Sequence, residues 1–279
     1  MDRGRRFRYS RYQTAMNPEE IARAKTRTRR MVDEALARLT PGRRRAASVA
    51  VKERVVNLPS VRDARTILVF LSLPTEIDTW PIIGWAWREA KRVAVPRIEP
   101  RRPSRASGPA LPSALRLPSG LSLRVEDRLE ESEAEGSSGG GGGGPPARRD
   151  MVAVVLPPAD VEGVAAHPSV RPGTLGILEV PDAPPLDVSE IDVALVPCQA
   201  VDRSGNRLGK GGGFFDRFLA RPDFRATAIA LAFLEQVLDQ VPVTRDDQPV
   251  SMVVTDAEVL SFAPRPKPGR KAGRGAVNA

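Results

Sequence analysis

The sequence has one cysteine, one histidine and no long apolar run, and each shortage excludes a class of protein. Cys198 has no second cysteine with which to form an internal disulfide, which favours a reducing compartment. A single histidine, His167, argues against histidine-based catalytic triads and multi-histidine zinc sites. Without eighteen consecutive apolar residues no membrane-spanning helix is expected, and the Arg-rich start lacks the apolar core of a secretory signal. We therefore expect a cytoplasmic protein without a membrane partner.

The excess of positive charge, +9 over 279 residues, is confined to the two ends of the sequence. Residues 1–12 carry five arginines and one aspartate, and residues 263–279 carry five cations and no acid. Residues 13–262 are consequently neutral overall and offer no field that would attract a polyanion. We expect a flexible basic lead over 1–16 and a solvated basic tail over 263–279. Weak binding of RNA by these ends is the alternative.

The lead itself allows two further interpretations. It is arginine-rich and nearly free of acids, which is typical of an organelle-targeting segment. Met16 stands just before a well-formed helix start, which also fits a mis-assigned initiator. The sequence leaves both open.

Between residues 17 and 262 helical and strand-like segments alternate. Asn17 to Glu20 supplies an N-cap, a proline at the first helical position and acids against the helix dipole, so a helix is expected from there to about Leu39, ended by Thr40-Pro41-Gly42. Further helices are expected at about 44–58, 78–90, 214–219 and 235–240, and strands at 66–71, 92–96, 151–156, 191–196, 227–233 and 252–254. This alternation of apolar strands and helices predicts a single α/β domain with a parallel sheet covered by helices.

The alternation stops between about residues 101 and 149. Proline, serine and arginine dominate first, then acids, and then six consecutive glycines. Such a composition cannot form a core, so we expect an inserted, disordered loop. The glycine run is not expected to bind phosphate, because no strand precedes it and no helix follows it.

The most informative stretch is RLGKGGGFFD at residues 207–216, between the strand expected at 191–196 and a helix start. Its glycines let the backbone approach a ligand and adopt positive φ, and their N–H groups can surround phosphate oxygens. Arg207 and Lys210 add positive charge, and Asp216 supplies a carboxylate of the kind that binds Mg²⁺. The pattern is neither a P-loop nor GxGxxG, so another kind of phosphate site is expected. The alternative is a surface turn in which Asp216 caps the helix.

Residues 207–217 resemble the signature RLGxGxGYYD of the 5-formyltetrahydrofolate cyclo-ligases, also called methenyltetrahydrofolate synthetases. Six further segments match that family in order along the chain, which makes the resemblance specific. They are KxxxR at 25–29, FLSLPTEIDT at 70–79, VPR at 95–97, LGILE at 175–179, ALAFLEQ at 230–236 and VPVTRDD at 241–247.

The resemblance implies a three-layer α/β sandwich, with a mostly parallel sheet and helices on both faces, that uses ATP and Mg²⁺ to convert 5-formyltetrahydrofolate to 5,10-methenyltetrahydrofolate. The implied ATP-binding residues are Lys25, Arg29, Arg207, Gly209, Lys210, Gly211, Gly212, Gly213, Phe214 and Phe215. The implied folate-binding residues are Leu71, Glu76, Lys210, Gly211, Gly212, Gly213 and Phe214. Asp216 and Asp247 are the implied metal ligands, and Lys210 and Arg207 the implied catalytic residues.

The implied chemistry explains these residue types. The N5-formyl oxygen is a poor leaving group until it accepts the γ-phosphoryl group of ATP; N10 then attacks the formyl carbon and phosphate departs. Phosphoryl transfer depends on in-line positioning and charge neutralisation, which Lys210, Arg207 and Mg²⁺ on Asp216 would supply. No protein nucleophile is required, and Cys198 is interpreted as a small buried residue.

Departures from the family pattern leave the substrate open. Phe214-Phe215 replaces a usual pair of tyrosines, Val180 stands where proline is common, and Lys210 stands where many relatives have an aromatic residue and some have arginine. The alternative is a paralogue that keeps the nucleotide site but acts on another substrate or binds RNA. Individual residues have alternative roles too. Glu76 could cap a helix, and Lys25 could be a solvated charge. The metal-ligand role assigned to Asp247 could belong to Asp246.

Overall fold

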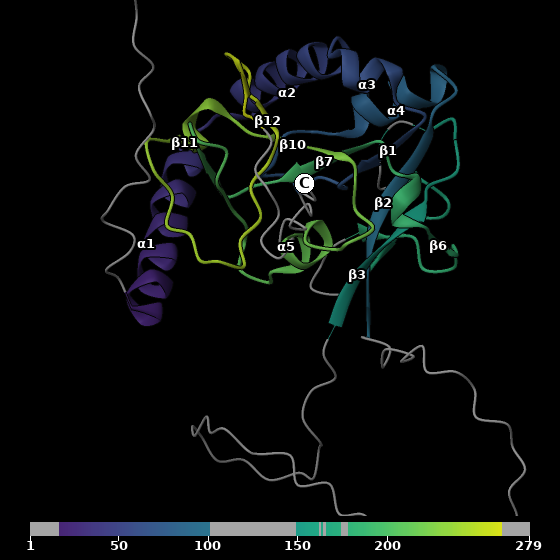
Figure 1. The fold of residues 1–279 in the computed structure, drawn as a ribbon. Helices are drawn as coiled ribbons and strands as arrows, with labels where there is room; N and C mark the ends of the chain where they lie inside the picture. The colour runs from purple at the N-terminus through teal and green to yellow at the C-terminus, as the bar shows by residue number, and fades with distance from the viewer. Residues whose placement is uncertain (1–16, 101–148, 162, 164–165, 174–177, 264–279) are drawn as a thin grey trace, which may run out of the picture. The chain divides into compact units, whose positions relative to one another are not determined.

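The computed structural model describes residues 17–100, 149–161, 163, 166–173 and 178–263 (Figure 1). The chain divides into residues 1–99 with 149–279 and, separately, residues 100–148. The helices and strands described belong to the first unit, apart from Pro100 at the end of one strand. The expected basic lead, basic tail and nearly all of the expected insertion lie outside the described residues. In the described part, no helix is long and apolar enough to cross a membrane.

Eight strands form one sheet in the order β13-β12-β10-β7-β1-β2-β3-β6. They are β1 (Thr66–Val69), β2 (Arg92–Pro100), β3 (Arg149–Val155), β6 (Pro185–Leu186), β7 (Val193–Pro197), β10 (Thr227–Leu231), β12 (Met252–Val254) and β13 (Val259–Ser261). The five central strands, from β12 to β2, pair in parallel, whereas β13 and β6 add antiparallel edges. The mostly parallel sheet predicted from the sequence is confirmed.

The strand order reverses between β1 and β7. From β1 the chain proceeds to β2 on one side, and from β7 it proceeds to β10 and β12 on the other. Leu68 of β1 lies level with Ala94 of β2 and Ala194 of β7, so the three strands end at the same edge. In open α/β sheets, ligands bind outside the carboxyl ends of the strands at such a reversal.

Helices cover both faces of this sheet (Figure 1). The helices on one side are α1 (Pro18–Ala37), α2 (Pro41–Val56), α3 (Pro59–Asp63) and α4 (Trp80–Arg88), and those on the other are α5 (Phe214–Leu219) and the 3₁₀ helix η4 (Val188–Glu190). Alternate residues of β1 serve the two cores, because Ile67 and Val69 face the first layer and Leu68 the second. The predicted three-layer arrangement is confirmed, with a thinner second helical layer.

The start of α1 is stabilised as its sequence predicts. Asn17 Oδ1 accepts the Glu20 N–H at 2.9 Å, and Glu20 Oε2 accepts the Asn17 N–H at 2.9 Å, which is a complete capping box. The second helix begins earlier than the predicted residue 44. Thr40 Oγ1 caps it by accepting the Arg43 N–H at 3.2 Å, and Pro41 is its first residue. Thr40-Pro41 therefore starts a helix as well as ending one.

Two predicted connections differ from the structure. The helix expected at 235–240 is a short 3₁₀ helix, η5 (Leu234–Gln236), followed by strand β11 (Val237–Leu238). The glycine turn does not follow β7 directly, because β8 (Ala200–Asp202) and β9 (Arg207–Leu208) lie between them and join β11 in a separate sheet. Strands β8, β9 and β11 are too short to show a hydrophobic period and, unlike the three-residue β12, are not predicted from the sequence.

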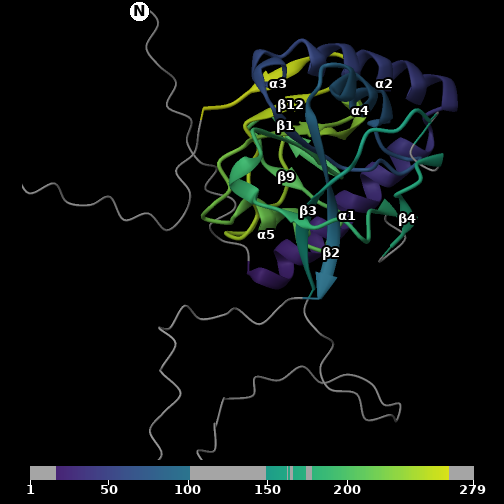
Figure 2. The same cartoon turned by 90° about the vertical axis from the view of Figure 1, so that its right-hand side faces the viewer.

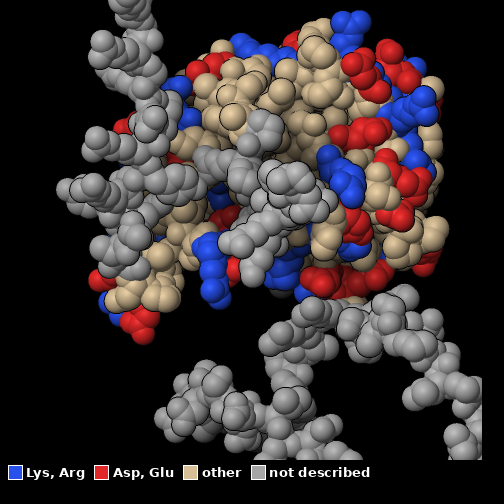
Figure 3. All heavy atoms as spheres, in the orientation of Figure 1, with Lys and Arg blue, Asp and Glu red and all other residues tan. Residues whose placement is uncertain are grey.

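Charges of both signs are interspersed over the visible surface of the domain (Figure 3). This distribution agrees with the predicted neutrality of residues 13–262. Strands β2 and β3 are neighbours in the sheet (Figure 2), and the N–H of Leu156, just beyond the end of β3, donates to the Val93 carbonyl near the start of β2 at 2.9 Å. These two strands therefore run in opposite directions, and residues 100 and 149 lie at the same end of the pair.

Candidate active site

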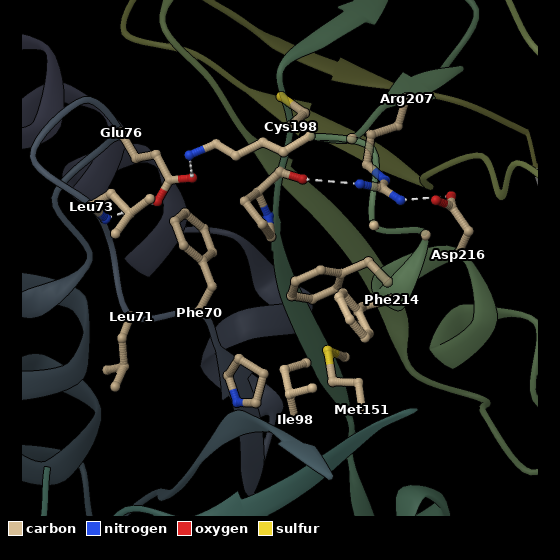
Figure 4. A pocket seen from close by; sticks show the side chains of 17 residues that line it. Phe70, Leu71, Leu73, Glu76, Ile98, Met151, Cys198, Arg207, Phe214 and Asp216 are labelled. Carbon is tan, nitrogen blue, oxygen red and sulfur yellow. Dashed lines mark hydrogen bonds and ion pairs between the residues drawn. The ribbon is translucent and has the colours of Figure 1, made fainter. Parts of the chain in front are cut away.

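A cavity of about 310 Å³ lies where the strand order reverses, at the carboxyl ends of β1 and β7 (Figure 4). One wall is apolar and comes from the ends of β1 and from β2 and β3. The opposite wall is the glycine turn between β9 and α5. The lining residues are Phe70, Leu71, Leu73, Glu76, Pro96, Ile98, Met151, Pro197, Cys198, Arg207, Gly209, Lys210, Gly212, Gly213, Phe214, Phe215 and Asp216.

Most of the predicted site residues line this cavity. They are Leu71, Glu76, Arg207, Gly209, Lys210, Gly212, Gly213, Phe214, Phe215 and Asp216. Gly211 belongs to the same turn but does not line the cavity, and Lys25, Arg29 and Asp247 contact the surrounding segments instead. Sequence reasoning missed the apolar members Phe70, Ile98 and Met151; their only signal is their place in, or directly after, predicted strands.

The backbone of the glycine turn presents N–H donors that have no partner in the described part of the chain. Two of its carbonyl oxygens accept from arginine side chains, since Gly209 accepts from Arg29 Nε at 2.9 Å and Gly212 accepts from Arg217 Nη1 at 3.2 Å. The N–H groups of residues 210–213 donate to nothing within the described part of the chain. Unpaired N–H groups in a turn of this kind bind anions.

The glycines serve two different needs. Gly211 and Gly213 have φ of +113° and +61°, so positive φ is confirmed for these two alone. Gly212 has an ordinary φ, but a Cβ on it would lie 2.8 Å from the Phe214 ring. The turn therefore depends on glycine both for its bend and for the close approach of an aromatic ring.

Arg207 is buried and holds Asp216 at the edge of the cavity. Its Nη2 lies 2.6 Å from Asp216 Oδ1, and its Nη1 donates to the Pro197 carbonyl at 3.2 Å (Figure 4). The Arg207 side chain is 2% exposed, and its Nε is buried with no partner among the described residues. The Gln248 N–H also donates to Asp216 Oδ1, at 3.2 Å, whereas Oδ2 accepts no hydrogen bond from the described part of the chain.

Lys210 and Glu76 form an ion pair between the two walls of the cavity. Lys210 Nζ lies 2.7 Å from Glu76 Oε1, and Glu76 Oε2 accepts the Leu73 N–H at 2.8 Å (Figure 4). Glu76 therefore fixes the loop after β1 and does not cap α4, which begins at Trp80 with Thr79 as its N-cap. The capping alternative for Glu76 is wrong.

One stripe of α1 ties this helix to the segments around the cavity. Lys25, Arg29 and Asp33 are four residues apart and share a face. Lys25 Nζ lies 2.7 and 2.5 Å from the two oxygens of Asp247, and Asp33 Oδ1 accepts from Gln199 Nε2 at 2.6 Å. Lys25 is thus paired and not simply solvated. Asp33 was not predicted, although the repeated spacing of four is a signal that could have indicated it.

The two predicted metal ligands, Asp216 and Asp247, differ in how many of their carboxylate oxygens already accept hydrogen bonds. Both oxygens of Asp247 accept hydrogen bonds, from Lys25 and also from the Thr244 N–H and Oγ1 at 2.5 and 3.0 Å. Asp216 retains one open carboxylate oxygen beside the cavity. Within the described residues, no three His, Cys, Asp or Glu side chains gather to enclose a metal. This donor set fits Mg²⁺, which usually binds one or two carboxylates together with phosphate oxygens and water. Metal binding by Asp216 and Asp247 stays a prediction.

The remaining cavity residues have structural explanations. The rings of Phe214 and Phe215 line the cavity and pack against the second core, with the Arg217 guanidinium 5.0 Å from the centre of Phe214. Cys198 is buried, and burial raises the pKa of its thiol to about 12. A thiol with such a pKa is protonated at neutral pH, which supports its interpretation as a small buried residue.

Two of the matched sequence segments are structural supports beside the cavity. Arg97 is buried and its Nη1 donates to the carbonyl oxygens of Val180, Pro181 and Ala183 at 3.1, 2.7 and 2.6 Å. Glu179 Oε1 accepts the N–H of Ile98, a cavity residue, at 3.1 Å. These contacts fix the wall that β2 contributes.

Comparisons with known proteins agree on one family. The sequence matches the model of the 5-formyltetrahydrofolate cyclo-ligase family over residues 21–133 and 151–256. It is 28% identical over 233 residues to 5-formyltetrahydrofolate cyclo-ligase of Escherichia coli strain K12, covering 83% of this chain and all of that protein. It is 42% identical over 92 residues to the enzyme of the same name from Mycolicibacterium smegmatis, covering 30% of this chain and 47% of that one.

Solved structures share the fold. The NMR structure of Aquifex aeolicus 5,10-methenyltetrahydrofolate synthetase aligns with a TM-score of 0.58 and 19% identity, covering 90% of this chain and 98% of that one. The Mycoplasma pneumoniae 5,10-methenyltetrahydrofolate synthetase aligns with a TM-score of 0.52 and 12% identity, covering 83% and 98%.

Proposed function

The chain belongs to the 5-formyltetrahydrofolate cyclo-ligase family, and we propose that it catalyses the ATP-dependent cyclisation of 5-formyltetrahydrofolate to 5,10-methenyltetrahydrofolate, with release of ADP and phosphate. The observation that carries the proposal is one cavity with two chemically different walls. A cationic turn with open N–H groups forms one wall, and an apolar surface bounded by a carboxylate forms the other. The volume of about 310 Å³ suits the reacting ends of two ligands that extend beyond it.

The glycine turn is the proposed site of the ATP phosphates. The N–H groups of residues 210–213 would donate to phosphate oxygens, and Lys210, whose side chain is 45% exposed, is mobile enough to follow them. Arg29 holds the Gly209 carbonyl and so keeps the turn in place. Lys25 supports the same region through Asp247.

The apolar wall is the proposed site of the folate ring system. The Phe70 ring on one side and the Phe214 ring on the other offer flat apolar faces, and Leu71 adds aliphatic surface, so an aromatic or partly reduced bicyclic ring packs well there. Glu76, fixed by the Leu73 N–H, offers a carboxylate to the N–H groups of such a ring.

The reaction follows from bringing the two ligands together. The formyl oxygen attacks the γ-phosphorus of ATP, the bond to the bridging oxygen breaks and ADP leaves. N10 then attacks the formyl carbon, and the C–O bond breaks with release of phosphate. N10 loses its proton, and the methenyl bridge between N5 and N10 remains. Lys210 would balance the charge on the transferred phosphoryl group, and Arg207 would hold Asp216 in place.

Mg²⁺ is the proposed cofactor, bound through the open oxygen of Asp216, with Asp247 as the second proposed ligand. An ion held there would supply positive charge that offsets the charge of the phosphates. Arg207 holds the Asp216 carboxylate in its orientation through the contact at 2.6 Å, so this ligand would be positioned before an ion binds.

The test is the growth of methenyltetrahydrofolate absorbance when 5-formyltetrahydrofolate, ATP and Mg²⁺ are supplied. Lys210→Ala should fold normally and lose about 10²–10³ in rate, and Asp216→Ala, although less stable because Arg207 loses its partner, should lose a similar factor. The matched controls Lys52→Ala and Asp223→Ala change exposed ion pairs and should keep the wild-type rate. Binding of ATP without any cyclisation would contradict the proposal and favour a paralogue with another substrate.

A further inference from the structure

Lys210 and Glu76 are each other's partner, although the proposed function uses them for different ligands. Lys210 would bind the phosphates of ATP, and Glu76 would accept hydrogen bonds from the folate. In the structure Lys210 Nζ lies 2.7 Å from Glu76 Oε1. Each ligand therefore competes with this ion pair for its residue.

The two members of the pair differ in freedom. The Glu76 side chain is 12% exposed, and the Leu73 N–H holds its second oxygen at 2.8 Å. The Lys210 side chain is 45% exposed and has no other polar contact with the described part of the chain. Lys210 is therefore the member that swings away, and Glu76 stays in position.

Breaking the pair leaves Glu76 in an unfavourable state. Its carboxylate borders a cavity whose nearby lining includes Phe70, Leu71 and Leu73, and an ionised group beside apolar surface needs a partner. A departed Lys210 thus makes Glu76 a stronger acceptor for the N–H groups of a ligand. Conversely, a ligand that occupies Glu76 releases Lys210 for an anion.

We propose that the Lys210–Glu76 pair couples the binding of ATP to the binding of the folate. Whichever ligand binds first breaks the pair, and the second ligand finds its residue already released. The result is positive cooperativity, which is equal in both directions. This inference rests on the proposed function, since it takes Lys210 for the phosphates and Glu76 for the folate. A half-exposed ion pair can change an affinity by up to about fivefold, which sets the coupling expected.

The decisive measurement is the affinity for ATP with Mg²⁺, without folate, by isothermal titration calorimetry. Glu76→Gln removes the partner of Lys210 and should bind ATP about fivefold more tightly than the wild type. Glu53→Gln, which removes the exposed partner of Lys52, is the matched control and should bind ATP like the wild type. A residue that only shaped the folate wall would not affect ATP, so equal or weaker ATP binding by Glu76→Gln overturns the inference.

A second measurement tests the coupling itself. The affinity for the β,γ-imido analogue of ATP is measured with and without saturating 5-formyltetrahydrofolate, and the ratio of the two is the coupling. Glu76→Gln, Lys210→Met and the double variant should share one ratio, about fivefold smaller than that of the wild type. An unchanged ratio in Glu76→Gln overturns the inference alone. A wild-type chain that binds no ATP overturns the proposed function and the inference with it.

Discussion

Replacing Arg207 with methionine should destabilise the domain through Asp216. The Arg207 side chain is 2% exposed and Asp216 is 17% exposed, and their charged groups approach to 2.6 Å. Removing one member of a buried ion pair costs about 3–5 kcal/mol, because the remaining charge is left unpaired. Asp216 keeps the Gln248 N–H and borders the cavity, where water can reach it, so the lower end of about 3 kcal/mol is expected.

The reverse change should cost a similar amount. Asp216→Asn leaves the buried guanidinium without a charged partner among the described residues, beside only the Pro197 carbonyl and the Phe215 ring, again at a cost of about 3 kcal/mol. The double variant Arg207→Met with Asp216→Asn leaves no unpaired charge and should recover about 2 kcal/mol of the summed loss. This recovery measures the interaction between Arg207 and Asp216 separately from the effect of changing the size of each side chain.

The assay is guanidinium denaturation in the presence of a chelator, so that bound metal does not contribute. Fluorescence follows the three tryptophans, all in α4, and circular dichroism follows the whole domain; coincident transitions justify a free energy of unfolding. Full additivity of the two single losses in the double variant would refute the reasoning, because it would mean that Arg207 and Asp216 do not interact.

Three further predictions follow from other parts of the domain. Gly212→Ala places a methyl group 2.8 Å from the Phe214 ring and should raise the KM for the folate severalfold. In the control Gly42→Ala the new methyl group lies 4.0 Å from Thr40 Oγ1, its nearest neighbour, and the kinetics should not change. Equal KM values for the two variants would contradict this prediction. Lys25→Met removes the partner of Asp247 and should lower the free energy of unfolding by about 2 kcal/mol in the same denaturation assay. The control Arg23→Met breaks an exposed pair with Glu19 and should lower it by less than about 0.5 kcal/mol. A larger loss in Arg23→Met than in Lys25→Met would contradict this prediction. The pKa of the Cys198 thiol rises from 9.0 to about 12 on folding, so between pH 9 and 12 the unfolded chain loses a proton that the folded chain keeps. Stability should therefore fall by about 1 kcal/mol from pH 8 to pH 10 through this group, and Cys198→Ala should lack that part of the loss.

The parallel strands and the first helix could be predicted because their signals are local. Residues 193–196 form a continuous apolar run, and Asn17 to Glu20 contains a complete capping box. The hairpin of β8 and β9 could not be predicted, because two strands of two or three residues contain no full hydrophobic period. That omission placed the glycine turn directly after β7, one hairpin too early.

Within the site, residue types were predictable and their partners were not. The spacing of Arg207, Lys210 and Asp216 among glycines indicated an anion site. Nothing local indicates that Lys210 meets Glu76, because that contact depends on two strands ending at the same edge of the sheet. The partner of a charged side chain depends on which residues lie near it in the fold. Predicting that partner therefore requires the topology of the sheet as well as the local motif.

The contact between Lys25 and Asp247 spans 222 positions of the chain and has a consequence for biosynthesis. A nascent polypeptide emerging from the ribosome carries its first helix long before the residues that this helix binds. Contacts of such separation form late, since the intervening chain must first be ordered. The ligand-binding apparatus is therefore completed only after residue 247 has been synthesised, and shorter nascent chains leave the polar stripe of α1 without its partner.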